Sequence, residues 1–449
     1  MMSRQREEYH QYLWPPFTQM GDLEKDTEPL IITGGRGAWV TDEEGREYLD
    51  AHGGLWVSNV GFGRMEIAEA VYEQMKEMAW FPSFESMSNP PATGLARRLV
   101  QLMEREGMSR VFFSSGGSEA VETALKMARQ YWRLKGREGR YKVISRKGAY
   151  HGVTMGALSA CGQMGNRRRF EPLVPGFSHI EPPYCYRCPF NAEPESCDLL
   201  CARQLERELE FQDPGSVAAF IGEPVMGSGG VIIPPEGYWP LIQDICRRHD
   251  VLLIMDEVMT GLGRTGEMCA SRHWDLSPDM MVFAKALTSG YQPLGATLTR
   301  EEIYQAHLGD MVQDVHFRHG NTYSGHPAAC AAGLANLDIT EKEDLPGRSA
   351  RLGEHLLSRL EELRDLPVVG DVAGLGLLAR VELVKSADSK EPFPENDLVG
   401  LGVARELQRR GIILRPLGDI LTISPPLVID EAEIDHLVGT LKEVLAGLA

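Results

Sequence analysis

The chain has 449 residues, 43% of them hydrophobic and 24% charged, a composition typical of a globular protein with a sizeable core. Lys and Arg number 46 against 64 Asp and Glu, so the formal net charge of −18 disfavours nucleic acid and anionic membranes as partners. No apolar run approaches the roughly 20 residues of a membrane helix. Residues 1–16 lack the apolar core of a secretory signal, so we expect a cytoplasmic protein.

Apolar and β-branched runs alternate with helical patterns up to about residue 330. The residue patterns predict strands at 110–113, 142–145, 218–222, 251–255 and 280–283. They predict helices at 65–78, from Ser118 onward, and at 238–248. Strand–helix alternation of this kind indicates an α/β fold with a mostly parallel sheet.

The character of the chain changes after residue 330. Helices are expected at 331–341, 347–364, 396–410 and 430–448, with strands at 377–383 and within 412–423. This pattern is typical of a small α+β domain, and the first 50 or so residues are expected to pack against it. We therefore predict three segments: 1–60 as the N-terminal part of the small domain, 61–330 as the large domain, and 331–449 as the C-terminal small domain.

Two carboxylates, Asp256 and Glu257, follow directly after the predicted strand 251–255. Ligands in open α/β sheets bind outside the carboxyl ends of the strands, which makes this pair a candidate for chemistry. The next segment, GLGRTG at 261–266, matches the dinucleotide fingerprint G-x-G-x-x-G. In that fingerprint the acidic residue follows the glycines, whereas here the acidic pair precedes them, so a nicotinamide dehydrogenase is disfavoured.

Lys285 follows the predicted strand 280–283 within the segment FAKALTSG. Lysine is rarely buried without a partner, and desolvation lowers the pKa of its amine, which makes the amine a nucleophile for carbonyl groups. A lysine and an aspartate at two strand ends suit a pyridoxal cofactor. Lys285 would hold the cofactor's aldehyde carbon as an imine, and Asp256 would face its pyridine nitrogen.

A seat for the cofactor's phosphate is expected in the segment FFSSGGSEAVETALK at 112–126. The segment runs from a strand through a glycine-containing turn into a helix that starts near Ser118. Glycine lets backbone N–H groups approach an anion closely, and a helix N-terminus favours negative charge. The turn is therefore a candidate phosphate site.

Five motifs together resemble the class III aminotransferases of pyridoxal-phosphate (PLP) fold type I. The motifs are SSGGSEA at 114–120, AYHG at 149–152, GEPVMGSGG at 222–230, DEVMTGLGRTG at 256–266 and AKA at 284–286. They occur in the family's order along essentially the whole chain. The omega branch, with amine, ω-amino acid and taurine:pyruvate transaminases, is the most similar. The resemblance implies a large domain with a mostly parallel, seven-stranded type of sheet and a small α+β domain.

The resemblance also implies roles for individual residues. Lys285 would be the catalytic residue and carry PLP as a Schiff base. The remaining cofactor-binding residues would be Gly117, Ser118, Tyr150, His151, Glu223, Asp256, Val258 and Thr322. The substrate-binding residues would be Trp56, Tyr150 and Arg415. One departure from the family pattern is Gly116, which stands where the family usually has serine.

Some of these roles have plainer alternatives. Thr322 would reach the phosphate of the neighbouring subunit, so its role requires a homodimer, with a tetramer as a further possibility. Trp56 could equally be a core residue, and Arg415 an exposed residue at a strand end. Tyr150 and His151 could be plain core or surface residues, and Glu223 a simple charge at a strand end.

The expected activity is transfer of an amino group from an amine or ω-amino acid donor to a keto acid such as pyruvate, by a ping-pong mechanism on Lys285. The alternative is a PLP-dependent aminomutase or decarboxylase of the same fold. The sequence does not separate taurine, β-alanine, diamines and arylalkylamines as donors.

Four cysteines form a separate motif of the pattern C-x2-C-x8-C-x3-C at Cys185, Cys188, Cys197 and Cys201. Four thiolates at this kind of spacing can hold a structural zinc ion. A disulfide or free thiols are the alternatives.

Overall fold

A seven-stranded sheet forms the centre of the computed structural model, which describes residues 3–21, 29–193, 196–310 and 312–448. In spatial order the strands are β4 (Arg110–Ser114), β10 (Gly295–Thr299), β9 (Met280–Phe283), β8 (Leu252–Asp256), β7 (Val217–Gly222), β5 (Lys142–Arg146) and β6 (Phe177–Ile180). β10 is antiparallel to β4 and β9, and the other neighbouring pairs are parallel. The predicted mostly parallel sheet is confirmed.

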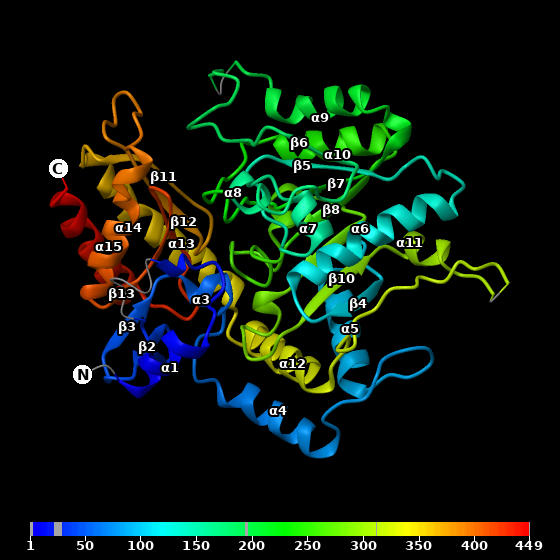
Figure 1. Cartoon of the computed structure of the whole chain (residues 1–449), viewed down its shortest axis with the longest axis horizontal. Helices are drawn as coiled ribbons and strands as arrows, with labels where there is room; N and C mark the ends of the chain where they lie inside the picture. The colour runs from blue at the N-terminus through cyan, green and yellow to red at the C-terminus, as the bar shows by residue number, and fades with distance from the viewer. Residues whose placement is uncertain (1–2, 22–28, 194–195, 311, 449) are drawn as a thin grey trace.

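Helices cover both faces of this sheet (Figure 1). One face packs against α5 (Pro90–Leu102), α9 (Leu200–Phe211), α10 (Tyr238–Arg248) and α12 (Pro327–Lys342). The other face packs against α6 (Gly117–Leu134), α7 (Met155–Ala160) and α11 (Glu301–Ala306). All six residues of β7 are buried, with Phe220 facing one helical layer and Ile221 the other. The sequence of a strand that is buried on both faces is a continuous apolar run.

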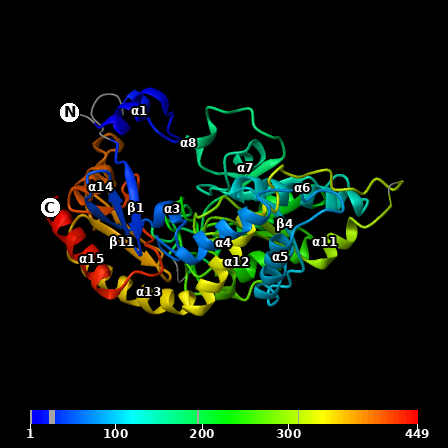
Figure 2. The same ribbon diagram turned by 90° about the horizontal axis from the view of Figure 1, so that it is seen from below.

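The two ends of the chain build a second body with two four-stranded sheets. One sheet contains β1 (Ile32–Arg36), β2 (Trp39–Asp42), β3 (Glu47–Asp50) and β13 (Ile412–Ile413), with β13 parallel to β3. The other contains β11 (Val369–Gly374), β12 (Ala379–Leu383), β15 (Ile420–Ile423) and β14 (Arg415–Leu417), all antiparallel. Figures 1 and 2 show the blue N-terminal strands beside the orange and red C-terminal elements.

The remaining helices connect or cover these sheets. The small body carries α13 (Leu345–Glu361), α14 (Val399–Arg409) and α15 (Glu431–Ala446), and the others are α1 (Arg4–Tyr12), α3 (Gly53–Trp56), α4 (Met65–Glu77) and α8 (Met164–Arg167). Short 3₁₀ turns are η1 (Pro214–Ser216), η2 (Ala270–Trp274), η3 (Lys285–Leu287), η4 (Glu362–Asp365) and η5 (Glu395–Asp397). Among the described residues, no helix is long and apolar enough to cross a membrane.

Arg264, within the GLGRTG segment, joins the two bodies. Its side chain is fully buried. It donates hydrogen bonds to the backbone oxygens of Leu377 (3.0 Å) and Pro425, and to Oδ1 of Asn59 (2.7 Å). One guanidinium thus connects the loop after β8 to both terminal segments of the chain. These contacts assign the segment a structural role, in agreement with the argument against a dinucleotide fingerprint.

Candidate active site

A cavity of about 640 Å³ opens at the carboxyl ends of the parallel strands, where open α/β sheets bind their ligands. Ten of the predicted site residues line it: Trp56, Gly117, Ser118, Tyr150, His151, Glu223, Asp256, Val258, Lys285 and Arg415. Thr322 does not line the cavity, and its side chain is exposed on this chain. A contact of Thr322 with a neighbouring subunit therefore stays a prediction.

Lys285 begins the short turn η3, directly beyond the end of β9. Its φ of +45° lies in the left-handed region, which is uncommon for a residue other than glycine and is concentrated at functional sites. Burial lowers the pKa of Lys285 to about 8, while the carboxylates of Asp256 and Glu223 act in the opposite direction. Nζ forms no hydrogen bond or ion pair with any residue that the structure describes, so its amine is available to a ligand.

The two adjacent carboxylates at the carboxyl end of β8 face different environments. Asp256 is 4% exposed and lines the cavity. Its Oδ2 lies 2.7 Å from Nδ1 of His151, and its Oδ1 accepts a hydrogen bond from the backbone N–H of Val258 (3.1 Å). Glu257 does not line the cavity. The acidic pair thus separates into one residue available for chemistry and one with a structural role.

Glu257 is held by hydrogen bonds from three residues of the neighbouring segments. It accepts from the hydroxyls of Thr260 (2.5 Å) and Ser271 (2.6 Å), and from the backbone N–H groups of Ala270 (3.1 Å) and Ser271 (2.8 Å). Both of these N–H groups belong to the start of η2. The carboxylate therefore fixes the loop that follows Asp256.

The N-terminus of α6 provides the predicted phosphate seat. The first N–H groups of a helix have no partner within it, and here they border the cavity at Gly116, Gly117 and Ser118. The N–H of Ser115 is already paired with the carboxylate of Glu119 (2.7 Å). A Cβ at Gly117 would lie 3.1 Å from Cγ1 of Val258, so the close approach of the two segments favours glycine at this position.

Glu223 lines the cavity and has one carboxylate oxygen without a hydrogen-bond donor among the described residues. The residue is 6% exposed, and its Oε2 accepts no hydrogen bond from the described residues. Arg146 lies behind it, with Nη2 donating to the Glu223 backbone oxygen and lying 3.9 Å from Oε2. Burial raises the pKa of the Glu223 carboxyl to about 7, because the nearby cations only partly offset the loss of water.

Trp56 lies between the two cations of the cavity. Its ring centre is 5.5 Å from Nζ of Lys285 and 5.5 Å from Cζ of Arg415. Residues 53–56 all have positive φ values, including Leu55 (79°) and Trp56 (58°), so a left-handed turn brings the indole into the cavity. Such a conformation costs about 1–2 kcal/mol for each residue other than glycine. Arg415 forms no ion pair with a carboxylate of the described residues, which leaves its guanidinium free for a ligand.

Polar residues without a predicted role also line the cavity, among them Gln163, Asn166 and Ser228. Ser228 lies inside the GEPVMGSGG motif, so the motif marked its position without indicating its role. Gln163 and Asn166 belong to an irregular segment around the four-residue helix α8. No residue pattern in that segment distinguishes a cavity wall from a surface loop.

The four cysteines of the C-x2-C-x8-C-x3-C motif border a second, much smaller cavity. No group of three or more His, Cys, Asp or Glu within the described ranges is arranged to hold a metal ion. Burial raises the pKa of Cys201 to about 12 and also raises that of Cys185, so both thiols are protonated in the metal-free chain. The predicted zinc site is therefore not supported.

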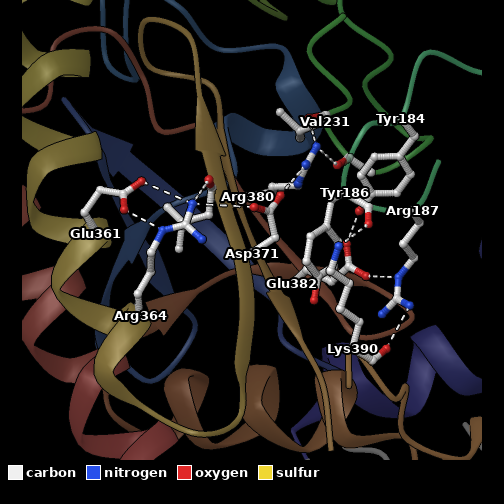
Figure 3. A network of polar contacts seen from close by, with 12 residues as sticks. Tyr184, Tyr186, Arg187, Val231, Glu361, Arg364, Asp371, Arg380, Glu382 and Lys390 are labelled. Carbon is white, nitrogen blue, oxygen red and sulfur yellow. Dashed lines mark hydrogen bonds and ion pairs between the residues drawn. The ribbon is translucent and has the colours of Figure 1, made fainter. Parts of the chain in front are cut away.

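The cysteine segment instead docks against the sheet of the small body (Figure 3). The hydroxyl of Tyr184 and Nε of Arg187 both donate to the buried carboxylate of Glu382 on β12. Arg187 also donates to the backbone oxygen of Lys390 (3.0 Å). These contacts indicate a structural role for the segment, as a connection between the large and small bodies.

Comparisons with known proteins agree with this geometry. The family model "Aminotransferase class-III" matches residues 21–445. A putrescine–pyruvate aminotransferase of Pseudomonas aeruginosa is 40% identical, over 96% of this chain and 93% of that protein. A taurine–pyruvate aminotransferase of Bilophila wadsworthia is 38% identical, over 96% of this chain and 94% of that protein.

Solved structures show the same likeness. An amine transaminase from an uncultivated Pseudomonas species, in its PLP-bound form, superposes with a TM-score of 0.94 at 41% identity, over 98% of this chain and 99% of that one. A thermostable omega-transaminase of Thermomicrobium roseum gives a TM-score of 0.94 at 42% identity, over 99% of this chain and 98% of that one. The chain belongs to the class III aminotransferase family, and its fold is that of PLP fold type I.

Proposed function

We propose that this chain is a PLP-dependent transaminase that carries its cofactor on Lys285. It moves an amino group from an amine or ω-amino acid donor to a keto acid such as pyruvate, in two half-reactions. The observation that carries the proposal is the position of Lys285 at the end of β9. There it borders one cavity together with Asp256 and the N-terminus of α6.

The residues of the cavity fit PLP at each of its polar groups. The amine of Lys285 suits the aldehyde, and the carboxylate of Asp256, oriented by His151, suits the pyridine nitrogen. The first turn of α6 suits the phosphate, which takes up helix N–H groups that lack internal partners. When bound, PLP supplies an electron sink for charge that develops at the substrate's Cα.

The chain's own residues supply binding and proton transfer. With a pKa of about 8, about a tenth of Lys285 is neutral at pH 7 and about half at pH 8, and this neutral amine can take a proton from the substrate Cα and return it. The unpaired guanidinium of Arg415 can bind both oxygens of a keto acid's carboxylate. Trp56 and Tyr150 form the walls of the cavity and limit the water that reaches the reacting atoms.

Pyruvate is the acceptor that we propose. The support comes from two relatives whose names describe pyruvate-dependent aminotransferases. Pyruvate has one carboxylate, which matches Arg415, the one arginine among the described residues that line the cavity. The donors of these relatives, putrescine and taurine, differ in charge, so the relatives do not define one donor for this chain.

We further propose a homodimer, with a tetramer of two such dimers as the larger assembly, in the cytoplasm. Large apolar side chains are exposed along α4 and the segment after it, at Tyr72, Met75, Met78, Trp80, Phe81, Phe84 and Met87. The ring of Trp80 contacts that of exposed Tyr323, the neighbour of Thr322. Exposed apolar side chains concentrated in one segment favour association with a partner. It would bring Thr322 to the partner's phosphate site.

The decisive experiment measures alanine formed from pyruvate with a panel of amine donors. Purified protein supplied with PLP should form alanine and carry a visible absorption band. Lys285→Ala should lose both, whereas Lys442→Ala, which removes a half-exposed lysine on α15, should keep both. An aminomutase or decarboxylase would leave pyruvate unconverted with every donor, and that result would refute the proposal.

A further inference from the structure

The wall of the cavity formed by Gln163, Asn166 and Ser228 carries uncharged polar groups. Gln163 and Asn166 come from the segment around α8, and Ser228 from the loop after β7. All three border the cavity that also contains Lys285 and Arg415. The proposed chemistry at Lys285 uses none of them.

The orientation of the Gln163 amide is determined by its neighbours. Nε2 donates to the backbone oxygens of Ser228 (2.9 Å) and Gly148 (3.2 Å), and lies 3.0 Å from the hydroxyl of Ser228. Backbone carbonyls only accept hydrogen bonds, so the nitrogen of this amide must face them. The reversed orientation would place Oε1 against two carbonyl oxygens.

The orientation of the Gln163 amide also determines that of the Asn166 amide. Because Gln163 turns Oε1 away from the carbonyls, that oxygen accepts from Nδ2 of Asn166 at 2.7 Å. The amide nitrogen of Asn166 is thereby assigned, and so is its carbonyl oxygen. Oδ1 of Asn166 accepts no hydrogen bond from the described residues. Asn166 is partly buried and borders the cavity, and its carbonyl oxygen is therefore free to accept a hydrogen bond from a ligand.

The loop that carries Ser228 is also held from its outer side. Nη1 of Arg380 on β12 donates to the backbone oxygen of Val231 at 2.6 Å, and Arg380 is itself paired with Asp371 (Figure 3). Arg380 is 4% exposed. The wall is thus fixed in place before a ligand binds, which reduces the entropy that binding must lose.

We infer that this wall is a specificity subsite for the distal end of the amine donor, and that the donor carries a hydrogen-bond donor there, as an amino alcohol or a diamine does. The inference rests on the proposed transamination at Lys285. A distal hydroxyl or ammonium group can donate to Oδ1 of Asn166, whereas a methyl group leaves that oxygen without a partner. Arg415 would then serve the keto acid, and Asn166 the donor.

The test compares three donors with the same number of non-hydrogen atoms: 4-aminobutan-1-ol, 1,4-diaminobutane and pentylamine. With pyruvate as acceptor, kcat/KM should be about tenfold higher for a donor that can bond to Asn166 than for pentylamine, the effect of one hydrogen bond left unmade. Comparison of 4-aminobutan-1-ol with 1,4-diaminobutane shows whether a distal hydroxyl or a distal ammonium group is preferred. Equal values for all three donors would overturn the inference while leaving the transaminase intact.

Two variants assign the effect to one side chain. Asn166→Leu should reduce the tenfold preference over pentylamine to about onefold. Asn166→Asp should shift the preference from 4-aminobutan-1-ol toward 1,4-diaminobutane, because a carboxylate attracts the distal ammonium group of the diamine. Asn396→Leu, at an exposed asparagine in η5, is the matched control and should change none of these ratios. A preference that survives Asn166→Leu would overturn the assignment.

A readout independent of turnover is a crystal structure of the holoenzyme soaked with 4-aminobutan-1-ol. The hydroxyl is expected within hydrogen-bonding distance of Oδ1 of Asn166. A hydroxyl directed elsewhere would contradict the subsite. The absence of alanine with every donor would instead refute the proposed function, so the two failures are distinguishable.

Discussion

Replacement of Glu257 by leucine tests whether the two neighbouring carboxylates have separate roles. Leucine is similar to glutamate in size but accepts no hydrogen bond, so the buried N–H groups of Ala270 and Ser271 lose their acceptor. The two hydroxyls that contact Glu257 can rotate toward other acceptors, whereas these backbone groups cannot. At about 1–3 kcal/mol for each unsatisfied group, Glu257→Leu should lower the free energy of unfolding by about 4 kcal/mol.

The measurement is a urea titration of the apoprotein followed by circular dichroism, with Asp256→Asn as the matched control. The asparagine of this control variant retains the volume of aspartate and can still bond to His151 and Val258, so the free energy of unfolding should change by less than about 1 kcal/mol. The transamination rate of the control variant, in contrast, should fall by about a thousandfold. Two opposite unit charges about 4 Å apart attract by roughly 4 kcal/mol at an effective dielectric near 20, which corresponds to about a thousandfold in rate.

Opposite outcomes would refute this division of roles. If the urea midpoint of unfolding of Glu257→Leu equals that of the wild type, the hydrogen bonds to η2 do not stabilise the loop. If Asp256→Asn keeps wild-type activity, the carboxylate does not act on the cofactor, and the proposed function loses its electrostatic basis.

Three further predictions concern the cavity. Because burial lowers the pKa of Lys285 to about 8, its neutral form predominates above that value, and the apoprotein's reaction with an aldehyde probe should accelerate from pH 7 to 9 and then level off. A profile rising only near pH 10 would contradict this. Arg415→Leu should raise the KM for pyruvate by about 10–100-fold and change the KM for the donor little, as measured from steady-state rates. An unchanged KM for pyruvate would show that Arg415 does not bind the carboxylate of the keto acid. Gly117→Val should weaken PLP binding in an absorbance titration, because even a Cβ there lies 3.1 Å from Val258; wild-type affinity would contradict the close approach.

Most of the large sheet could be predicted because its strands are continuous apolar runs. β7, β8 and β9 are buried on both faces, and such strands stand out in any sequence. β6 and β10 were not predicted. β10 reads GATLT, with small residues that fit the tight packing next to α6 but give no strong apolar pattern. The domain boundaries at residues 60 and 330 remain predictions.

The amino-acid sequence by itself determined the family, most strands of the large sheet, and the positions of Lys285 and Asp256 at strand ends. These features depend on local periodicity and on motifs that a single segment carries. Only the tertiary structure decided that Asp256 faces the cavity while Glu257 faces η2, and that Gln163 and Asn166 join Ser228 in one wall. The direction of a side chain at a strand end, and the partners of an amide, depend on segments far away in the chain. Local sequence patterns carry no information about those contacts.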